Sequence, residues 1–133
     1  MIVSLIFTVK NEAASLARLL DSILAQTRAP EDIVVVDGGS ADATLAILRD
    51  YARRLPLSII SQPGANISQG RNAAIRAACG DIICSTDAGV RLDANWLAEI
   101  SKPFENNAVQ AVAGFFVADP RGVFETALAA TTL

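Results

Sequence analysis

Short apolar runs that stop abruptly at small and acidic residues are the feature that most constrains the fold of this chain. Residues 33–36 are four β-branched residues, and Asp37 and two glycines follow at once. The run over residues 82–86 likewise ends at Asp87. Such runs are typical of strands buried on both faces of a parallel sheet. Because open parallel sheets bind ligands beyond the C-terminal ends of their strands, the two carboxylates predict one polar site there.

Strand-like and helix-like segments alternate along the chain. The pattern predicts strands over residues 2–8, 33–36, 57–60, 81–86 and 109–117, with helices from Asn11, near residues 42 and 68, around Trp96, and over 124–130. This alternation predicts an α/β fold with a doubly wound, mainly parallel sheet. In a 3-2-1-4 strand order, residues 8–12 would lie beside Asp87, with Asp37 one strand away.

Individual residues are expected to mark the ends of the helices. Asp42 is expected to cap the second helix, and Asp93 is expected to be the N-cap of the helix around Trp96. Gly80 is expected at the C′ position of the third helix, where a left-handed backbone favours glycine.

Composition narrows the class of protein. The chain has 133 residues, 52% of them hydrophobic and 19% charged, which indicates one globular domain. Its net charge of −3 argues against binding to nucleic acid or to an anionic membrane surface. Histidine is absent from the sequence, so a Ser-His-Asp triad and a His-ligated zinc site are excluded within this chain.

The cysteines and the N-terminal residues indicate the cellular compartment in which the protein is expected. Cys79 and Cys84 have no metal-binding spacing, and both are expected to be reduced and buried. The chain shows no signal-peptide pattern, and its longest apolar stretch is too short to span a membrane. The expected location is therefore cytoplasmic, with the inner face of the membrane as a second option.

Asp37 allows two interpretations. Its ionised carboxylate would accept hydrogen bonds from the imide N–H of uracil or the N–H groups of guanine, and the following glycines would let a flat ligand approach. The alternative is a turn residue that caps its own loop. Since residues 40–42 already supply capping side chains, Asp37 is expected to be available for a ligand.

Asp87 and the segment over residues 64–72 suggest a phosphate and metal site. One carboxylate together with substrate phosphates is a normal way to hold Mg²⁺, although a plain strand-end turn would also explain Asp87. Residues 64–72 lead from a loop into a helix that carries Arg71 in its first turn, which suits a phosphate. The segment is not a Walker A motif, and no G-x-G-x-x-G follows the first strand.

Five segments together resemble the family 2 glycosyltransferases of the GT-A fold: residues 3–12, 20–27, 33–44, 70–75 and 85–89. The resemblance implies binding of a nucleotide-diphosphate sugar, UDP- or GDP-linked, and transfer of the sugar to an acceptor hydroxyl, usually with inversion. It implies that Thr8 and Glu12 line the nucleoside pocket and that Asp37 accepts from the base. Asn66 and Arg71 would lie near the base and diphosphate. Asp87 matches the first acid of the D-x-D motif, which contacts the ribose and a Mg²⁺ or Mn²⁺ ion.

The chain departs from the family in two ways. The third D-x-D position is Gly89, so the usual direct metal ligand is missing. The family's second half, which supplies the catalytic base and the acceptor site, has no counterpart in this sequence. We therefore expect residues 1–133 to form a single, truncated GT-A-like domain, with self-association as one way to cover its sheet edge. The alternative is a binding or assembly module that keeps the fold without turnover.

Overall fold

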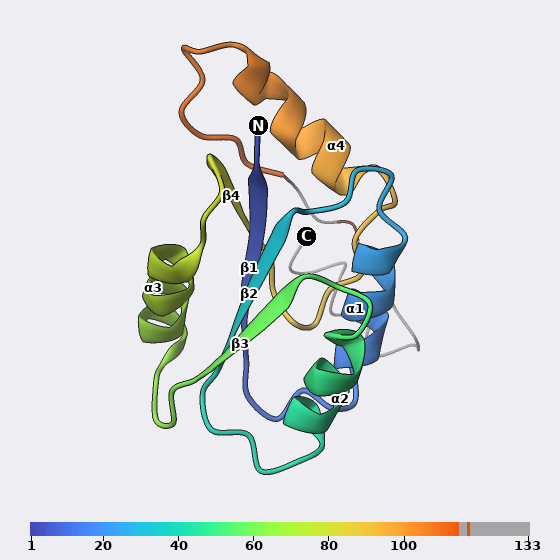
Figure 1. Cartoon of the computed structure of the whole chain (residues 1–133), viewed down its shortest axis with the longest axis vertical. Helices are drawn as coiled ribbons and strands as arrows, with labels where there is room; N and C mark the ends of the chain where they lie inside the picture. The colour runs from blue at the N-terminus through green and yellow to red at the C-terminus, as the bar shows by residue number, and fades with distance from the viewer. Residues whose placement is uncertain (115–116, 118–133) are drawn as a thin grey trace.

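The computed structural model describes residues 1–114 and 117. Its strands are β1 (Val3–Val9), β2 (Asp32–Asp37), β3 (Leu57–Ser61) and β4 (Ile82–Ser85). In the described part of the chain they form a parallel sheet with the order β3-β2-β1-β4 (Figure 1). The α/β class, the parallel pairing and the 3-2-1-4 order are therefore confirmed.

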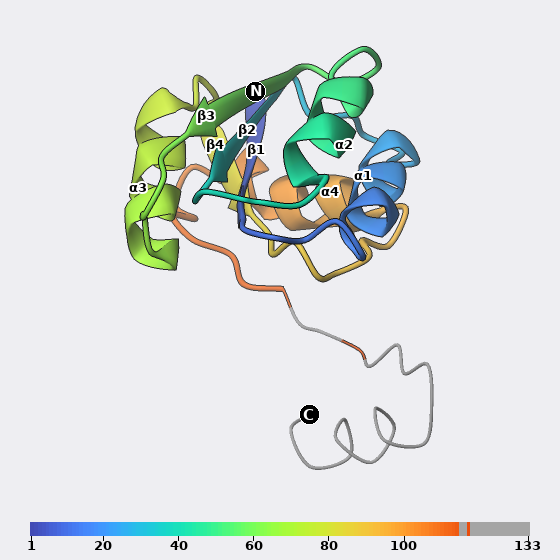
Figure 2. The same cartoon turned by 90° about the horizontal axis from the view of Figure 1, so that it is seen from below.

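The helices cover the two faces of the sheet unequally. They are α1 (Leu16–Leu24), α2 (Thr44–Tyr51), α3 (Ile67–Ala77), α4 (Trp96–Ser101) and the 3-10 helix η1 (Lys102–Glu105). Figure 2 shows α3 on one side of the sheet and α1, α2 and α4 on the other. A sheet with helices on both faces is the doubly wound arrangement that the alternating pattern predicts.

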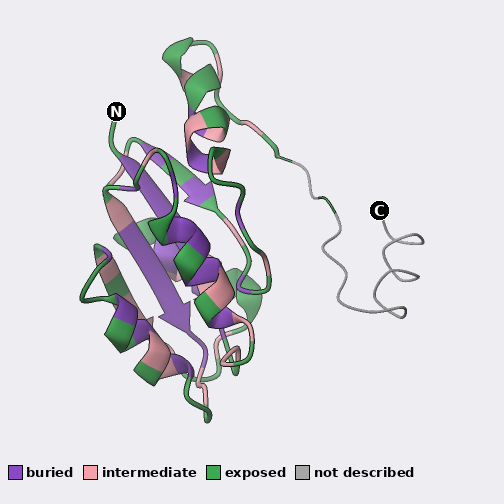
Figure 3. Cartoon of the chain, turned by 90° about the vertical axis from the view of Figure 1, so that its right-hand side faces the viewer, coloured by how far each residue is buried: buried purple, intermediate pink, exposed green. Residues whose placement is uncertain are grey.

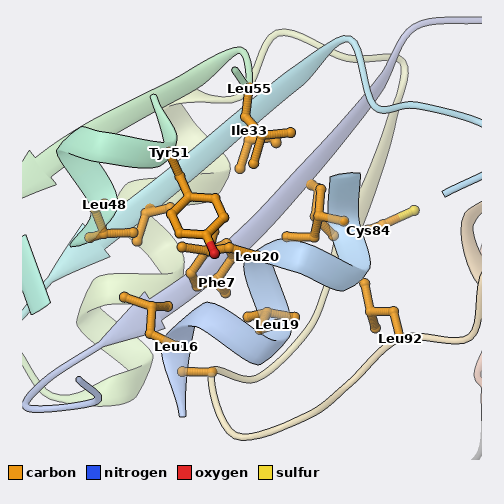
Figure 4. Packing of buried hydrophobic residues seen from close by; sticks show 14 of the residues in the cluster. Phe7, Leu16, Leu19, Leu20, Ile33, Leu48, Tyr51, Leu55, Cys84 and Leu92 are labelled. Atoms are coloured by element: carbon orange, nitrogen blue, oxygen red, sulfur yellow. The ribbon is translucent and has the colours of Figure 1, made fainter. Parts of the chain in front are cut away.

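Strand β1 separates two apolar layers by alternation. Leu5 and Phe7 face the larger layer, where they pack with Ile33 of β2 and Leu20 of α1 (Figure 4). Ile6 faces the smaller layer under α3. All residues of β1 except the half-buried Thr8 are buried, and Figure 3 shows strands of the sheet coloured mainly as buried. Burial on both faces explains why five of the seven β1 residues are apolar.

No helix in the described residues has the length and apolar character needed to cross a membrane.

Helix α1 begins later than predicted. Asn11 takes a left-handed backbone with φ of 53°, which interrupts the helical geometry expected from residue 11. Residues 12–15 then form a turn in which the Ser15 N–H donates to the Glu12 carbonyl at 3.1 Å. The regular helix starts at Leu16, where its apolar stripe meets the core.

The prediction of a fifth strand is wrong for residues 109–114 and 117, which have no strand pairing. Gly114 lies against α4 instead, because a β-carbon built there would lie 3.6 Å from side-chain atoms of both Ile100 and Trp96. An apolar stretch forms a strand only where a sheet edge pairs with it. The helix predicted over residues 124–130 lies outside the described residues.

Other expectations at the helix ends are revised. The N-cap of α2 is Ala43 rather than Asp42, although the Asp42 carboxylate accepts the Thr44 N–H at 3.0 Å. The N-cap of α4 is Asn95 rather than Asp93, although the Asp93 carboxylate accepts the Asn95 N–H at 2.9 Å.

Cys79 is exposed, contrary to expectation, whereas Cys84 is buried and both thiols are free.

Gly80 is not a helix C′ residue, because α3 ends at Ala77 with Ala78 as its C-cap. Glycine is needed at position 80 for a different reason. A β-carbon there would lie 2.6 Å from the Ser4 backbone nitrogen and 2.9 Å from the Ile2 carbonyl oxygen. Gly80 therefore lets the chain pass closely under the start of β1 before it enters β4.

We predict that Gly80→Ala lowers the free energy of unfolding by about 1–3 kcal/mol, because the added methyl group meets backbone that cannot move aside. The matched control is Gly89→Ala, whose β-carbon would meet nothing within 4 Å and which should stay within about 0.5 kcal/mol of wild type. Urea denaturation measures both variants. Equal stability of the two would contradict this packing role for Gly80.

The Asp32 carboxylate, at the start of β2, should make the stability of the fold depend on pH. Partial burial of the Asp32 carboxylate raises its pKa, but hydrogen bonds from the Ser4 hydroxyl (2.6 Å) and the Cys79 N–H (3.0 Å) outweigh burial and lower the pKa below the ordinary 3.8. A depressed pKa stabilises the fold above the unfolded-state value, and this contribution is lost as the pH falls through the folded-state value. The melting temperature should therefore fall between about pH 5 and pH 3.

We expect Asp32→Asn to reduce that acid-side slope, because the amide does not ionise. Asp50→Asn, at an exposed position of α2, serves as the control and should keep the wild-type slope. Thermal melts at pH 7, 5 and 3.5 compare the three proteins. A slope in Asp32→Asn as steep as in wild type would show that Asp32 does not carry the effect.

Candidate functional site

A groove lies at the C-terminal ends of the strands, with a volume of about 860 Å³. We call it the strand-end groove. Its lining comes from strand ends, loops and the start of α3. It includes Thr8 at the end of β1, Lys10 and Glu12 after it, Gly38 after β2, Asn66 and Ser68 at the start of α3, and Asp87 and Gly89 after β4. Four of the residues predicted from the sequence, Thr8, Glu12, Asn66 and Asp87, therefore meet in one groove.

The loops after β1 and β2 are joined to each other. The Asn11 N–H donates to the Ser40 hydroxyl at 2.9 Å, and the Ala41 N–H donates to the Asn11 side-chain oxygen at 2.8 Å. One residue further on, the Glu12 N–H donates to the Thr44 hydroxyl at 2.9 Å. Ser40, Ala41 and the first residue of α2 thus hold the backbone at and beside the lining residue Glu12.

Asp37 is engaged by its own turn, so the expectation that its carboxylate is available is wrong. One carboxylate oxygen accepts the Gly39 and Ser40 N–H groups at 3.0 and 3.1 Å, and the other accepts the Ser40 hydroxyl at 2.5 Å. The residue is only 1% exposed. Asp37 therefore shapes the turn that brings Gly38 to the groove, while its contact with a base stays a prediction.

Asn66 starts α3 and closes one end of the groove. Its side chain accepts the Gln69 N–H at 2.8 Å, and the Gln69 side chain accepts the Asn66 N–H at 3.0 Å, which is a capping box. Gly70 then allows close packing, because a β-carbon there would lie 2.9 Å from the Thr8 methyl group. These contacts fix the first turn of α3 against the end of β1.

Arg71 pairs with Asp87 across the site. The guanidinium Nη2 lies 3.5 Å from the Asp87 carboxylate, and the two side chains are 42% and 65% exposed. Such a long and exposed ion pair adds little to stability and leaves both groups able to change partners. The structure thus places Arg71 beside Asp87, the residue that matches the first acid of the D-x-D motif.

A second groove adjoins the first, and the two share Asp87 and Gly89. It lies beside β4 and α4 and is lined in part by Arg18, Arg71, Arg91 and Trp96. Arg18 of α1 donates to the Gly89 carbonyl at 3.2 Å, which ties α1 to the loop after β4. Asp87 therefore stands at the junction of the two grooves.

The donor set for a metal is sparse. No group of three or more His, Cys, Asp and Glu residues that could hold a metal ion occurs in residues 1–114 and 117. Asp87 is an exposed carboxylate at the groove, and one carboxylate plus substrate phosphates fits Mg²⁺ or Mn²⁺. The residues therefore fit a cation that arrives with, or is completed by, a phosphate ligand.

Sequence reasoning anticipated Gly38 and Lys10 but missed Gly70. Gly38 was expected to let a flat ligand approach, Lys10 belongs to the segment expected beside Asp87, and both residues line the groove. Gly70 also lines the groove and sets the approach of α3 to Thr8. Nothing in the sequence around Gly70 shows how closely the two elements approach.

Comparison with known proteins gives a consistent result. The family model of "Glycosyl transferase family 2" matches residues 4–131. A validoxylamine A glucosyltransferase from Streptomyces hygroscopicus subsp. limoneus is 34% identical over 93 residues, which cover 67% of this chain and 20% of that protein. A glycosyltransferase of Nostoc sp. is 32% identical over 84% of this chain and 35% of its own length.

Solved structures agree with the sequence comparison. S. aureus TarS 1–349 in complex with UDP-GlcNAc has 26% identity and a TM-score of 0.70, covering 79% of this chain and 32% of that chain. A mannosyltransferase from Pyrobaculum calidifontis, in complex with GDP-Man and Mn²⁺, has 30% identity and a TM-score of 0.69, covering 75% and 31%. The chain thus spans between a fifth and about a third of the length of these relatives.

The turn role of Asp37 can be separated from a ligand role by stability. We predict that Asp37→Ala lowers the free energy of unfolding by about 2–4 kcal/mol, because it removes a buried acceptor of three hydrogen bonds. Asp37→Asn should cost less, since its amide keeps one oxygen. Urea denaturation, with Asp50→Ala on α2 as the control, measures these effects. An Asp37→Ala protein as stable as the control would argue against the turn role.

Proposed function

The chain belongs to glycosyl transferase family 2, and on that basis we propose that it binds a nucleotide-diphosphate sugar in the strand-end groove. In this proposal residues 1–133 form one domain that holds the donor for inverting transfer of its sugar to an acceptor hydroxyl. The observation that carries the proposal is the meeting of Thr8, Glu12, Asn66 and Asp87 in one groove at the strand ends. This is where open parallel sheets bind ligands.

The nucleoside would lie between the loops after β1 and β2. Thr8 and Glu12 offer hydroxyl and carboxylate groups to ribose and base, and Gly38 leaves room for a flat ring to approach the backbone. Asp37 would accept from the base only if part of its turn rearranges, since its carboxylate is already hydrogen-bonded. TarS binds UDP-GlcNAc and the mannosyltransferase binds GDP-Man, so uracil and guanine are both candidate bases.

The diphosphate would lie toward Arg71. A guanidinium binds phosphate oxygens through charge-assisted hydrogen bonds. Arg71 would exchange its exposed pairing with Asp87 for the incoming diphosphate, a change that costs little because the pair is long and solvated. That exchange would free the Asp87 carboxylate when the ligand is present.

Asp87 would then hold a Mg²⁺ or Mn²⁺ ion together with the diphosphate. Such an ion acts as a Lewis acid that neutralises the charge of the departing diphosphate. The mannosyltransferase structure contains Mn²⁺ along with GDP-Man, which supports this part of the proposal. Gly89, at the third position of the motif, leaves open space where a second carboxylate would fit.

The transfer step also requires a base on the acceptor side. An acceptor hydroxyl attacks the sugar carbon as the diphosphate leaves, and a general base takes the hydroxyl proton. We place that base outside this chain, in the part of the family that the chain does not span. A binding or assembly module without turnover is the second candidate, and it is favoured by Gly89 at the motif position.

We predict that the chain binds UDP or GDP with a Kd between about 1 μM and 1 mM. Arg71→Ala should weaken this binding about tenfold while the melting temperature stays unchanged, because the residue is exposed and contacts the diphosphate in the proposal. Arg76→Ala, in the last turn of the same helix, is the matched control. Titration calorimetry measures all three proteins, and absence of binding to either nucleotide by wild type would refute the proposal.

The metal role predicts opposite changes at two positions of one loop. Mn²⁺ should tighten UDP binding to wild type, Asp87→Asn should abolish the enhancement, and Gly89→Asp should increase it about tenfold by adding a ligand. Asp81→Asn, at the other end of β4, is the control and should behave as wild type. Equal Mn²⁺ enhancement in wild type and Asp87→Asn would rule out Asp87 as the metal ligand.

Turnover separates the two candidate functions. Purified chain is incubated with UDP-glucose or GDP-mannose, Mn²⁺ and a simple hydroxyl acceptor such as glycerol, and released nucleotide is measured. Nucleotide release above the Asp87→Asn background would refute the module and would also show that the base lies within this chain.

A further inference from the structure

We propose that Asn11 is a positioning residue of the strand-end groove, where it locks the loops after β1 and β2 into the shape that receives the nucleotide. The inference rests on the proposed function, because it concerns the same groove. It assigns a role to a residue that itself does not line that groove in the described part of the chain.

The backbone of Asn11 is unusual. Its φ of 53° lies in the left-handed region, and it is the only non-glycine residue with positive φ among the described residues. Asparagine adopts this conformation more readily than most residues, because its short side chain bonds to nearby backbone. Glycine would adopt it more easily still, so the side chain of Asn11 must contribute something that glycine lacks.

That contribution is a two-way connection to the next loop. The Asn11 side-chain oxygen accepts the Ala41 N–H at 2.8 Å, while its own N–H donates to the Ser40 hydroxyl at 2.9 Å. The Ser40 hydroxyl in turn donates to the Asp37 carboxylate at 2.5 Å. A continuous chain of hydrogen bonds therefore runs from the end of β1 to the buried acid at the end of β2.

The connection continues into the start of both helices. The Glu12 N–H donates to the Thr44 hydroxyl at 2.9 Å, and the Ala13 N–H donates to the Asp42 carboxylate at 3.2 Å. Within residues 1–114, these two bonds and the two made by Asn11 form the clasp, a set of four hydrogen bonds between the loops. Three of its bonds use a side chain of the second loop or of the first residue of α2, and Asn11 alone supplies a side chain from the first loop.

The clasp acts on the groove through the neighbours of Asn11. Its neighbours in sequence, Lys10 and Glu12, line the groove, whereas Asn11 and Ser40 do not. Fixing Asn11 therefore fixes the backbone at both lining residues. A preformed wall binds its ligand more tightly than a mobile one, because less chain entropy is lost on binding. We therefore expect loss of the clasp to weaken nucleotide binding without removing any direct contact.

The experiment compares three changes at or near this position. Asn11→Gly keeps the left-handed backbone but loses the acceptor for the Ala41 N–H. Asn11→Asp keeps an acceptor oxygen, and Asn106→Gly removes a distant asparagine whose side chain similarly accepts the Ala108 N–H at 3.0 Å. UDP affinity is measured by calorimetry with Mn²⁺ present, and exchange of the Ala41 amide is followed in the free proteins by hydrogen–deuterium exchange.

We expect Asn11→Gly to bind UDP about tenfold more weakly, with a melting temperature close to wild type and faster exchange at Ala41. Asn11→Asp should recover the affinity to within about threefold of wild type, and Asn106→Gly should match wild type. Rescue by the oxygen-bearing variant distinguishes positioning from general destabilisation. Ser40→Ala, which removes the acceptor for the Asn11 N–H, gives an independent test should Asn11→Gly fail to fold, and it should weaken binding in the same direction.

Two results would overturn the inference in different ways. If wild type binds UDP and a folded Asn11→Gly protein binds it equally well, the clasp has no role in binding and the proposed function stands. If wild type binds neither UDP nor GDP, the proposed function fails, and the positioning role fails with it.

Discussion

The parallel pairing of β1 with β2 is the constraint on which the rest of the structure depends. Its register places Val9 opposite Asp37, so both strands end at the same level. The loops that follow are thereby brought side by side, close enough for the Gly38 N–H to donate to the Val9 carbonyl at 2.9 Å. The apolar layers on both faces of these strands hold this register, since a shift of one residue would turn buried side chains into the opposite layer.

The polar groups around the groove serve structure first. Asp37 caps its own turn and Asn66 caps α3, so each holds a loop before any ligand arrives. Arg71 and Asp87 differ, because their pairing is long and solvated. The site therefore combines a preformed wall with a pair of charges that can be rearranged, which suits recognition of a rigid nucleoside and a flexible diphosphate.

The sequence predicted the sheet well because burial on both faces leaves a strong signal. The apolar runs and their alternation with helical segments predicted the parallel sheet, and the 3-2-1-4 order considered for such a sheet is the one observed. Of the two acids after strands, Asp87 lines the groove. Two predictions failed because the outcome depends on contacts between distant segments. Gly80 is required by the backbone of Ser4, and residues 109–114 have no strand partner. These contacts leave no local pattern in the sequence. Asp37 differs, because the turn that occupies its carboxylate is local and was the alternative that the sequence had left open.

The position of Cys79 makes the chain well suited to oriented attachment. Its thiol is exposed, near the start of β2 and thus at the end of the sheet away from the groove, whereas Cys84 is buried. A tether or fluorophore joined there would leave the strand-end groove open to solution. The hydrogen bond to the Asp32 carboxylate raises the pKa of the Cys79 thiol, so coupling to a maleimide would be slow at neutral pH and faster in mildly alkaline buffer. Cys79 is thus a native attachment site that would fix the orientation of the chain in surface or single-molecule experiments.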